Sequence, residues 1–358
     1  MLREILHDLS DGNTSVINEK LMSPDYWAAI AFADGVRRHA PSATDELPIP
    51  EIQLDAARYD IGTRGYATIQ PEGWSWGDLA PALDKLRLAA MALRAAGWPP
   101  VFIFCLDLAW EVLDKLWLPM EALLGNDCVM DPSVFCWIAT TPSPVHSVMG
   151  SSSNSDDATE PRPSIGANFG VPHRDFTCLQ ALREHDGATV MLSVWLPLND
   201  VCGDNGCMMV LPRSLDPHFA QRFEYAHMRP AMPAGTQGKH GVREAMEVRF
   251  DLSCVKPLAP LKAGSLVAWA GNLIHWGTGC APESTTPPRC SIGFNFLAGG
   301  ARPLQDGKPL LSRIETRRCT GTAERLSLIA TSLLAYGPWY DIPDSAMPSD
   351  FYRTSNSM

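Results

Sequence analysis

The stretch "TVMLSVWLPLNDVCGDNGCMMVLP", residues 189–212, contains two short apolar runs on either side of a polar segment. The first run is rich in branched and aromatic residues and the second in methionine, valine and leucine. Between them lie Asn, Asp and Gly, which favour turns because they hydrogen-bond locally or tolerate unusual backbone angles. This pattern predicts two short β-strands with a turn-forming connection.

Comparable runs recur on both sides of this stretch, separated by Gly, Pro, Asn and Asp. They are "PSVFCWIATT" (132–141), "MEVRFDL" (246–252), "GSLVAWAG" (264–271) and "CSIGFNFLA" (290–298). Many short strands with turn signals between them are typical of an antiparallel barrel or jelly roll. We therefore expect a mainly β core with flanking helices, over residues from about 131 to 300.

The N-terminal part has helical patterning instead. We expect a helix within residues 23–40 with Ser23 as its N-cap, and another that ends at Gly97. A third helix is expected over residues 107–125, where Pro119 would bend or interrupt it. The run "YDIGTRGYATIQ", 59–70, is strand-like and follows a turn.

These signals divide the chain into a helical N-terminal extension, residues 1–50, and a single domain, residues 51–358, that contains the β core. Two polar stretches, 147–166 and 229–241, have the composition of long loops. Long loops in compact domains are often functional, so the second is a candidate lid.

Composition narrows the function classes. The chain has 358 residues, 46% of them hydrophobic, and a formal net charge of −11. This charge disfavours a nucleic-acid footprint or a polybasic membrane patch. No run of apolar residues is long enough to span a bilayer, and the N-terminal stretch does not resemble a signal peptide, so we expect a cytoplasmic protein without a membrane partner. The ten cysteines include no CxxC pair, which favours reduced thiols over a disulfide framework or zinc cluster.

The stretch "GVPHRDF", 170–176, places His173 and Asp175 two positions apart. Side chains alternate faces along a strand, so both would point the same way. His275 follows a strand-like run and a Gly-Asn turn, where a side chain can emerge at a barrel mouth. Two histidines and one carboxylate form the facial triad of non-haem Fe(II) oxygenases.

Arg289 and Ser291 follow this histidine at the start of the next strand-like run. An arginine can bind a carboxylate with two parallel hydrogen bonds, and a hydroxyl beside it can add a third. Alone, Arg289 would be interpreted as a surface ion pair. The order H-x-D, long gap, His, R-x-S favours a metal site with a carboxylate-binding arginine.

With these motifs the sequence resembles the phytanoyl-CoA dioxygenase-like family of Fe(II)/2-oxoglutarate-dependent oxygenases, roughly from Tyr59 to Phe296. The densest match is "LSVWLPLNDVCGDNGCMMVLPRSL", with its tryptophan strand, L-x-D turn and N-G-C step. The resemblance implies a double-stranded β-helix (cupin-like jelly roll) core. It implies the following roles: iron ligands His173, Asp175 and His275, 2-oxoglutarate arginine Arg289, and co-substrate neighbours Ser291 and Trp195.

The sequence departs from the family pattern in three places. Leu215 stands where the family has a histidine. Trp276-Gly277-Thr278 replaces the usual small residues after the second histidine, so the substrate-side wall is expected to differ. "ESTTPP", 283–288, lengthens the gap between His275 and Arg289.

The resemblance implies an enzyme that uses Fe(II) and 2-oxoglutarate to activate a C–H bond of a small metabolite with O2, yielding succinate and CO2. Hydroxylation, desaturation and oxidative cyclisation are all open, and secondary metabolism is the expected setting. Because Asp175 supplies a carboxylate, halogenation is disfavoured.

Two other functions stay open at this point: a zinc-dependent hydrolase built on the same ligands, and a non-catalytic β-barrel binding protein. Phe135 and Trp137 are expected in the barrel core more than in a pocket, and Arg174 at the surface or behind the site. The sequence does not indicate an oligomeric state.

Overall fold

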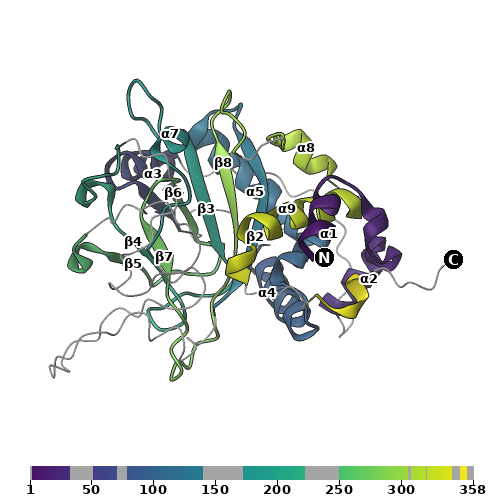
Figure 1. Cartoon of the computed structure of the whole chain (residues 1–358). Helices are drawn as coiled ribbons and strands as arrows, with labels where there is room; N and C mark the ends of the chain where they lie inside the picture. The colour runs from purple at the N-terminus through teal and green to yellow at the C-terminus, as the bar shows by residue number, and fades with distance from the viewer. Residues whose placement is uncertain are drawn as a thin grey trace, which may run out of the picture.

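The computed structural model describes residues 2–32, 51–70, 79–139, 172–221, 250–304, 308–319, 321–340 and 347–352. Two antiparallel sheets face each other, and helices cover the outer side of the larger sheet (Figure 1). This arrangement confirms the predicted jelly-roll core with flanking helices.

The larger sheet has five strands in the order β1-β6-β3-β8-β2. Their bounds are β1 Tyr66–Ile69, β6 Leu266–Ala270, β3 Met191–Pro197, β8 Cys290–Leu297 and β2 Val129–Ile138. The smaller sheet has the order β5-β4-β7, with β5 Lys256–Leu258, β4 Met208–Val210 and β7 His275–Gly277. The two runs of residues 189–212 thus form β3 and β4, which lie in different sheets, and the polar segment between them crosses from one sheet to the other.

Strands β3 and β8 form the centre of the larger sheet, and every residue of both is buried. Alternate side chains pack into the helical core: Leu192, Val194, Leu196, Ile292, Phe294 and Phe296. The intervening positions face the smaller sheet and pair across the strands, Ser193 with Asn295 and Trp195 with Gly293. The period of two therefore separates an apolar face from a face that carries polar and aromatic groups.

Helices α1, α2, α4, α5, α8 and α9 gather on one side of the larger sheet, away from β4, β5 and β7, whereas α3 and α7 lie on the other side of the view (Figure 1). Their bounds are α1 Leu2–Ser10, α2 Pro24–Ala31, α3 Glu51–Arg64, α4 Leu79–Ala95, α5 Asp107–Leu124, α7 Cys178–Ala181, α8 Arg313–Arg318 and α9 Thr322–Tyr340. Short 3-10 segments are η1 Thr14–Val16, η2 Glu19–Met22, η4 Pro100–Cys105, η6 Arg213–Leu215, η7 Leu252–Cys254 and η8 Ser349–Phe351. Helix α9, which sequence patterning did not identify, packs on both α1 and β2.

The N-terminal helices largely match the prediction. Ser23 is the N-cap of α2, although its side chain makes no capping hydrogen bond, and residues 33–40 lie outside the described chain. Helix α4 ends before Gly97, whose φ of 84° is the left-handed conformation expected after a helix end. Pro119 lies inside α5 and does not interrupt it.

Two strand predictions were wrong in part. Within "YDIGTRGYATIQ", residues 59–64 belong to α3, and only Tyr66–Ile69 is a strand. Gly65 separates the two with a φ of 83°, and a Cβ there would lie 2.7 Å from Leu273 Cδ1, so this position requires glycine. In "MEVRFDL", residues 246–249 lie outside the described chain, and Leu252–Cys254 is 3-10 helix because Asp251 caps it with a carboxylate that accepts from Ser253 N.

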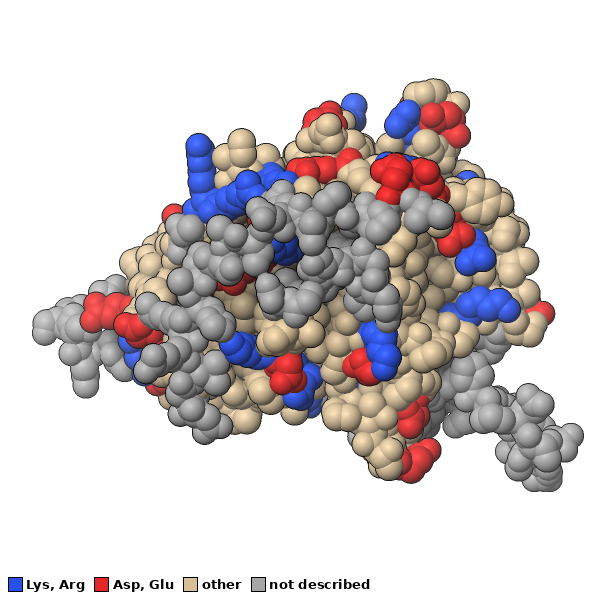
Figure 2. All heavy atoms as spheres, turned by 180° about the vertical axis from the view of Figure 1, so that it is seen from behind, with Lys and Arg blue, Asp and Glu red and all other residues tan. Residues whose placement is uncertain are grey.

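All ten cysteines lie in the described chain and each is a free thiol, as predicted. Of the helices that the structure describes, none is both long and apolar enough to cross a bilayer. On the described part of the face in Figure 2, basic and acidic side chains are interspersed. The division of the chain at residue 50 stays a prediction.

Replacement of Trp117 by alanine should destabilise the fold strongly. Trp117 is fully buried in α5 and meets Phe296 of β8 edge-on, with ring centroids 4.9 Å apart. Losing a buried aromatic ring costs about 3–5 kcal/mol of unfolding free energy, because the cavity it leaves collapses only partly. Urea unfolding followed by circular dichroism measures this change.

Tyr59→Ala is the matched control, since Tyr59 is an aromatic residue that is 71% exposed on α3. Its effect should be within about 0.5 kcal/mol. Equal destabilisation by the two substitutions would contradict the packing of α5 on the larger sheet.

Candidate active site

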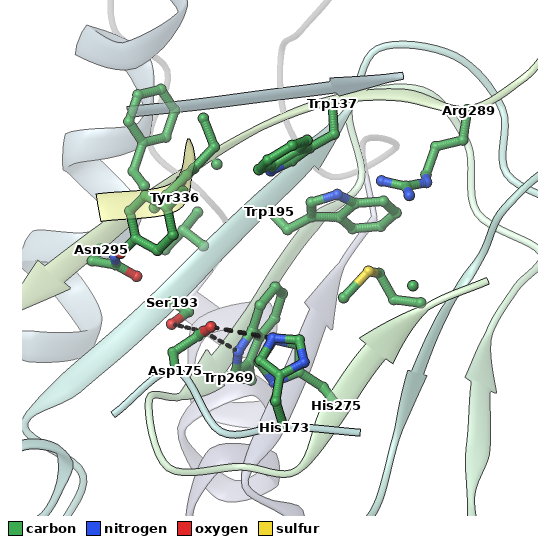
Figure 3. Close-up of a pocket in the computed structure, with 16 residues that line it drawn as sticks. Trp137, His173, Asp175, Ser193, Trp195, Trp269, His275, Arg289, Asn295 and Tyr336 are labelled. Carbon is green, nitrogen blue, oxygen red and sulfur yellow. Dashed lines mark hydrogen bonds and ion pairs between the residues drawn. The ribbon is translucent and has the colours of Figure 1, made fainter. Parts of the chain in front are cut away.

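A single pocket between the two sheets contains most of the residues that the sequence singled out (Figure 3). Its empty volume is about 610 Å³, including open solvent at its mouth. The described walls come from β2, β3, β6 and β8 of the larger sheet, β4 and β7 of the smaller sheet, and α9. The site therefore joins residues that are far apart in the sequence, from Phe135 to Tyr336.

His173, Asp175 and His275 converge at the base of this pocket (Figure 3). Asp175 Oδ1 lies 3.7 Å from His173 Nε2 and 3.5 Å from His275 Nε2. The three ligand atoms all lie within 4.8 Å of one another. Separations of about 3 to 4 Å suit ligands bonded to one metal ion at about 2.1 Å, so the donor set fits a divalent metal.

The two histidines are neighbours because their backbones pair. His173 N donates to His275 O at 3.1 Å, and His275 N donates to His173 O at 3.0 Å. The expected strand around His173 is only this isolated bridge. Even so, the pairing points both rings the same way, with centroids 4.5 Å apart.

Asp175 is oriented by two donors on its other oxygen. Ser193 Oγ donates to Oδ2 at 2.7 Å and Trp269 Nε1 at 3.2 Å, which leaves Oδ1 directed at the histidines. Burial alone would raise the pKa of Asp175, but His275, His173 and the Ser193 hydrogen bond hold it well below its usual range. The carboxylate is thus ionised and able to bind a cation.

His275 is held as a neutral ligand. Its Nδ1 lies 3.0 Å from Leu273 O, so Nδ1 carries the proton and Nε2 presents its lone pair. Burial lowers the pKa of His275 to about 4, although the charge of Asp175 opposes this shift. A neutral imidazole is the form that metals bind.

Arg289 lies at the opposite end of the pocket, just before β8 begins (Figure 3). It is 2% exposed, donates through Nη1 to Ser291 Oγ at 2.8 Å, and holds its Cζ 5.5 Å from the Trp195 ring centroid. Burial lowers its pKa to about 10, so it stays charged at neutral pH. Its Nε has no hydrogen-bond partner among the described residues, and no described carboxylate pairs with it. A buried cation in this state calls for an anionic ligand.

The polar segment between β3 and β4 fixes the backbone that leads to Arg289. The side chain of Asn205 accepts a hydrogen bond from Cys202 N and donates to Asp200 O and Pro287 O. Its backbone carbonyl accepts from Arg289 N at 2.9 Å. Gly206 has a φ of 104°, and a Cβ there would meet Ala139 Cβ at 2.6 Å. The N-G-C step therefore supports the arginine directly.

All six sequence-predicted site residues are brought to this region. Five of them line the pocket, and Ser291 reaches it through Arg289. Phe135 and Trp137 also line it, so their expected place in the barrel core was wrong. Both residues follow a bulge in β2, where the register against β8 shifts between Met130 and Val134.

Other expectations about the surroundings need correction. Of the two positions expected for Arg174, the surface is wrong and the one behind the site is confirmed: Arg174 is 4% exposed and pairs with Asp216, the residue that ends η6, at 2.7 Å. Trp276 does not form the substrate wall, since it packs with Leu211, Val255 and Ile274, and Gly277 lines the pocket instead.

Sequence reasoning missed Ser193, Trp269, Asn295 and Tyr336. Ser193 and Asn295 could have been found from the period of two, since Ser193 shares a strand face with Trp195, and Asn295 shares one with Ser291 and Gly293. Tyr336 lies on α9, far from the β core in sequence, and no motif indicates it. The candidate lid, 229–241, and the loop 147–166 lie outside the described residues.

Comparison with known proteins supports the expected class. The family model described as Phytanoyl-CoA dioxygenase (PhyH) matches residues 140–280, which include His173, Asp175 and His275. None of the curated proteins compared with the chain gave a match.

Among solved structures, the chain is similar to a non-heme monooxygenase, ThoJ, in its apo form, at 14% identity and a TM-score of 0.47, covering 78% of this chain and 99% of that chain. It is also similar to the epimerase SnoN in complex with Fe3+, alpha ketoglutarate and nogalamycin RO, at 16% identity and a TM-score of 0.43, covering 74% and 97%. EctD from S. alaskensis, with 2-oxoglutarate and 5-hydroxyectoine, has 17% identity and a TM-score of 0.41, covering 76% and 85%.

These structural similarities are low, so the expected class rests on the family model together with a His-Asp-His triad of matching chemistry. Residues 140–280 are similar to the phytanoyl-CoA dioxygenase family, and His173, Asp175 and His275 within them form the donor set expected of a non-haem iron, 2-oxoglutarate-dependent dioxygenase.

Proposed function

We propose that His173, Asp175 and His275 hold Fe(II) and that Arg289 binds the far carboxylate of 2-oxoglutarate. Ser291 and Trp195 lie beside that carboxylate, the serine as a hydrogen-bonding neighbour and the indole as a wall. The enzyme activates a C–H bond of a small-molecule substrate, by hydroxylation or by a related desaturation or oxidative cyclisation. O2 and 2-oxoglutarate are consumed, and succinate and CO2 are formed.

The observation that carries this proposal is the presence, in one largely apolar pocket, of a triad with two buried histidines and of the buried arginine Arg289. Arg289 is 2% exposed and opens into the pocket that His173 and His275 line. A zinc hydrolase would leave such an arginine without a role, because it needs a base and an oxyanion partner near the metal. A dicarboxylate can bind the metal with one end and form an ion pair with Arg289 through its other carboxylate.

Each group of residues would have its own role at the bound metal. Two neutral imidazole nitrogens and one carboxylate oxygen would occupy one face of the metal and leave its other coordination positions for ligands. Ser193 and Trp269 keep Asp175 in a single orientation, so the carboxylate presents one oxygen. Bound iron supplies the activation of O2 that couples 2-oxoglutarate decarboxylation to oxidation of a substrate C–H bond.

The pocket walls exclude water from the reacting centre. Trp195, Trp269, Phe135 and Trp137 surround the space with aromatic carbon. Such walls strengthen the ionic contacts of Arg289 and Asp175, because the local dielectric constant is low. They also favour a substrate with substantial apolar surface.

The ligand assignment predicts different defects for two variants under anaerobic conditions. Fe(II) and 2-oxoglutarate added to the wild-type protein should give a visible iron-to-ketoacid charge-transfer band. His275→Ala should lose the band because Fe(II) no longer binds tightly. Arg289→Ala should keep Fe(II) but bind 2-oxoglutarate roughly 10- to 100-fold more weakly, since a charge-assisted hydrogen bond is lost. Titration of the band measures both affinities.

Arg87→Ala and His185→Ala are the matched controls, because both side chains lie on the surface outside the pocket: Arg87 pairs with Asp84 on α4, and His185 is 74% exposed. Both controls should bind iron and 2-oxoglutarate as the wild type does. Tight zinc binding with no band in the wild-type protein would overturn the proposed function.

Orientation of Asp175 by Ser193 predicts a defect in metal affinity for Ser193→Ala. The variant removes the 2.7 Å hydrogen bond to Oδ2 without touching a ligand. Metal affinity should fall by roughly 10- to 100-fold, as is usual for residues that orient metal ligands. Competition of Fe(II) with a coloured chelator measures the change.

Ser265→Ala serves as the comparison, because Ser265 is a buried serine of the same sheet region that donates to Gln70 Oε1 at 2.9 Å, away from the triad. It should leave metal affinity unchanged. If the two variants have the same metal affinity, the hydrogen bond from Ser193 does not orient the carboxylate.

A further inference from the structure

The proposed metal ligands come from two short segments, residues 173–176 and 271–275, that lie side by side. Three backbone hydrogen bonds join these described residues. His173 and His275 exchange two of them, and Phe176 N donates to Gly271 O at 2.9 Å. The pairing at His173 is an isolated bridge outside any strand, so no regular sheet sets the spacing of the two segments there.

Arg174 supplies a side-chain link between the same two segments. Side chains alternate along an extended chain, so Arg174 points away from the pocket that His173 and Asp175 line. Behind the pocket, its Nη1 donates to the backbone carbonyl of Asn272. Asn272 lies in the turn that leads into His275. The guanidinium therefore joins the residue between the first two ligands to the turn that precedes the third.

A third segment holds the other arm of this guanidinium. Arg174 Nη2 forms an ion pair with Asp216 Oδ2 at 2.7 Å. The Asp216 side chain is fully buried and Arg174 is 4% exposed. The same short turn also binds Asn272, whose Nδ2 donates to Phe219 O at 2.6 Å. Residues 216–219 thus contact both ligand segments, one through Arg174 and the other through Asn272.

The chemistry of the pair favours a geometric role for it. A guanidinium is planar and presents its N–H groups in a fixed fork, so its two partners are held in one relative orientation. A buried ion pair adds little net stability, because the cost of removing both charges from water offsets most of their attraction. What this ion pair supplies is then the placement of the groups that it joins.

We propose that Arg174 is a positioning residue that sets the spacing between the H-x-D segment and His275, so that the three donors can reach one metal ion. Asp216 orients the guanidinium, and neither residue contacts the metal. This role differs from that of Ser193, which orients one oxygen of one ligand. The inference rests on the proposed function and adds a contact, behind the pocket, that assembles the metal site.

A double variant separates this role from a general loss of stability. Arg174→Met leaves the buried carboxylate of Asp216 without its cation, so the midpoint of urea unfolding of the metal-free protein should fall. Arg174→Met/Asp216→Leu removes both charges, and apolar replacement of a buried ion pair is often neutral for stability. The unfolding midpoint of the double variant should therefore be closer to the wild-type value than that of Arg174→Met.

Metal affinity should not recover in the double variant. The link to Asn272 O is absent from both variants, so each should bind Fe(II) roughly 10- to 100-fold more weakly than the wild type, as is usual when support of metal ligands is removed. Anaerobic competition of Fe(II) with a coloured chelator measures this affinity. Wild-type Fe(II) affinity in Arg174→Met/Asp216→Leu would overturn the inference.

Arg325→Met is the matched control, because Arg325 is also 4% exposed and binds backbone carbonyls away from the pocket. Its Nε donates to Cys319 O at 2.9 Å and its Nη1 to Cys105 O at 3.1 Å, and it pairs with Asp107 at 2.8 Å. Arg325→Met should lower the unfolding midpoint and leave Fe(II) affinity unchanged. Equal losses of Fe(II) affinity in Arg325→Met and Arg174→Met would also overturn the inference.

The charge-transfer band of the wild-type protein distinguishes failure of this inference from failure of the proposed function. If Fe(II) and 2-oxoglutarate give no band in the wild type, the proposed function is refuted. If the wild type gives the band and the double variant binds Fe(II) as tightly as the wild type, the triad holds iron without help from Arg174, and only the positioning role is refuted.

Discussion

The structure depends on one constraint: β3 and β8 are buried on both faces, and the two faces must satisfy different neighbours. One face meets helices and carries only apolar side chains. The other carries the serine that orients Asp175, the indole beside Arg289, and the amide beside Tyr336. Such groups are costly to bury unless each has a partner, so the pocket side of the sheet is polar only where a ligand or a hydrogen bond compensates. A shift of one residue in this pairing would exchange the two faces and remove both the core and the site.

Sequence patterning identified the β core and the triad because their signals are local or ordered along the chain. The strands have clear boundaries at Gly, Pro, Asn and Asp, and the H-x-D pair with a later histidine is a recognisable set. What patterning could not supply is the geometry that joins distant segments. The backbone pairing between His173 and His275 spans about a hundred residues, and it brings the ligands together without a regular strand at His173.

The errors also have physical causes. Residues 59–64 have a composition that suits a strand or a helix, and packing of α3 on β1 decides for the helix. Trp137 was assigned to the core because aromatic residues are usually buried there. It lines the pocket instead, close to a register shift in β2 that the sequence does not predict. Arg174 pairs with a carboxylate more than forty positions away, and no local signal predicts that pairing. Tyr336 was missed because it reaches the pocket from α9, a helix outside the β core.

The pocket has a polarity that follows from this assembly. At one end lies the buried guanidinium of Arg289. At the other end lie the phenol of Tyr336 and the amide of Asn295, near the carboxylates of Asp131 and Asp175. The metal triad lies at the base of the pocket, away from Arg289. Arg289, the one arginine or lysine among the described residues that line the pocket, thus lies apart from the metal triad, so an anionic group can bind there while the triad holds a metal.

Helix α9 also links the site to the order in which the chain is synthesised. The proposed metal ligands His173, Asp175 and His275 and the described strands of both sheets emerge from the ribosome before residues 322–340. The nascent chain thus has its metal ligands before the wall that carries Tyr336 exists. Helix α9 must then dock on β2, where Val134 N donates to Ser332 Oγ. It must also dock on α1, where the Ser327 hydroxyl donates to Ser10 O at 2.7 Å. The pocket is therefore complete only after residues 322–340 have been synthesised and have docked on the rest of the chain.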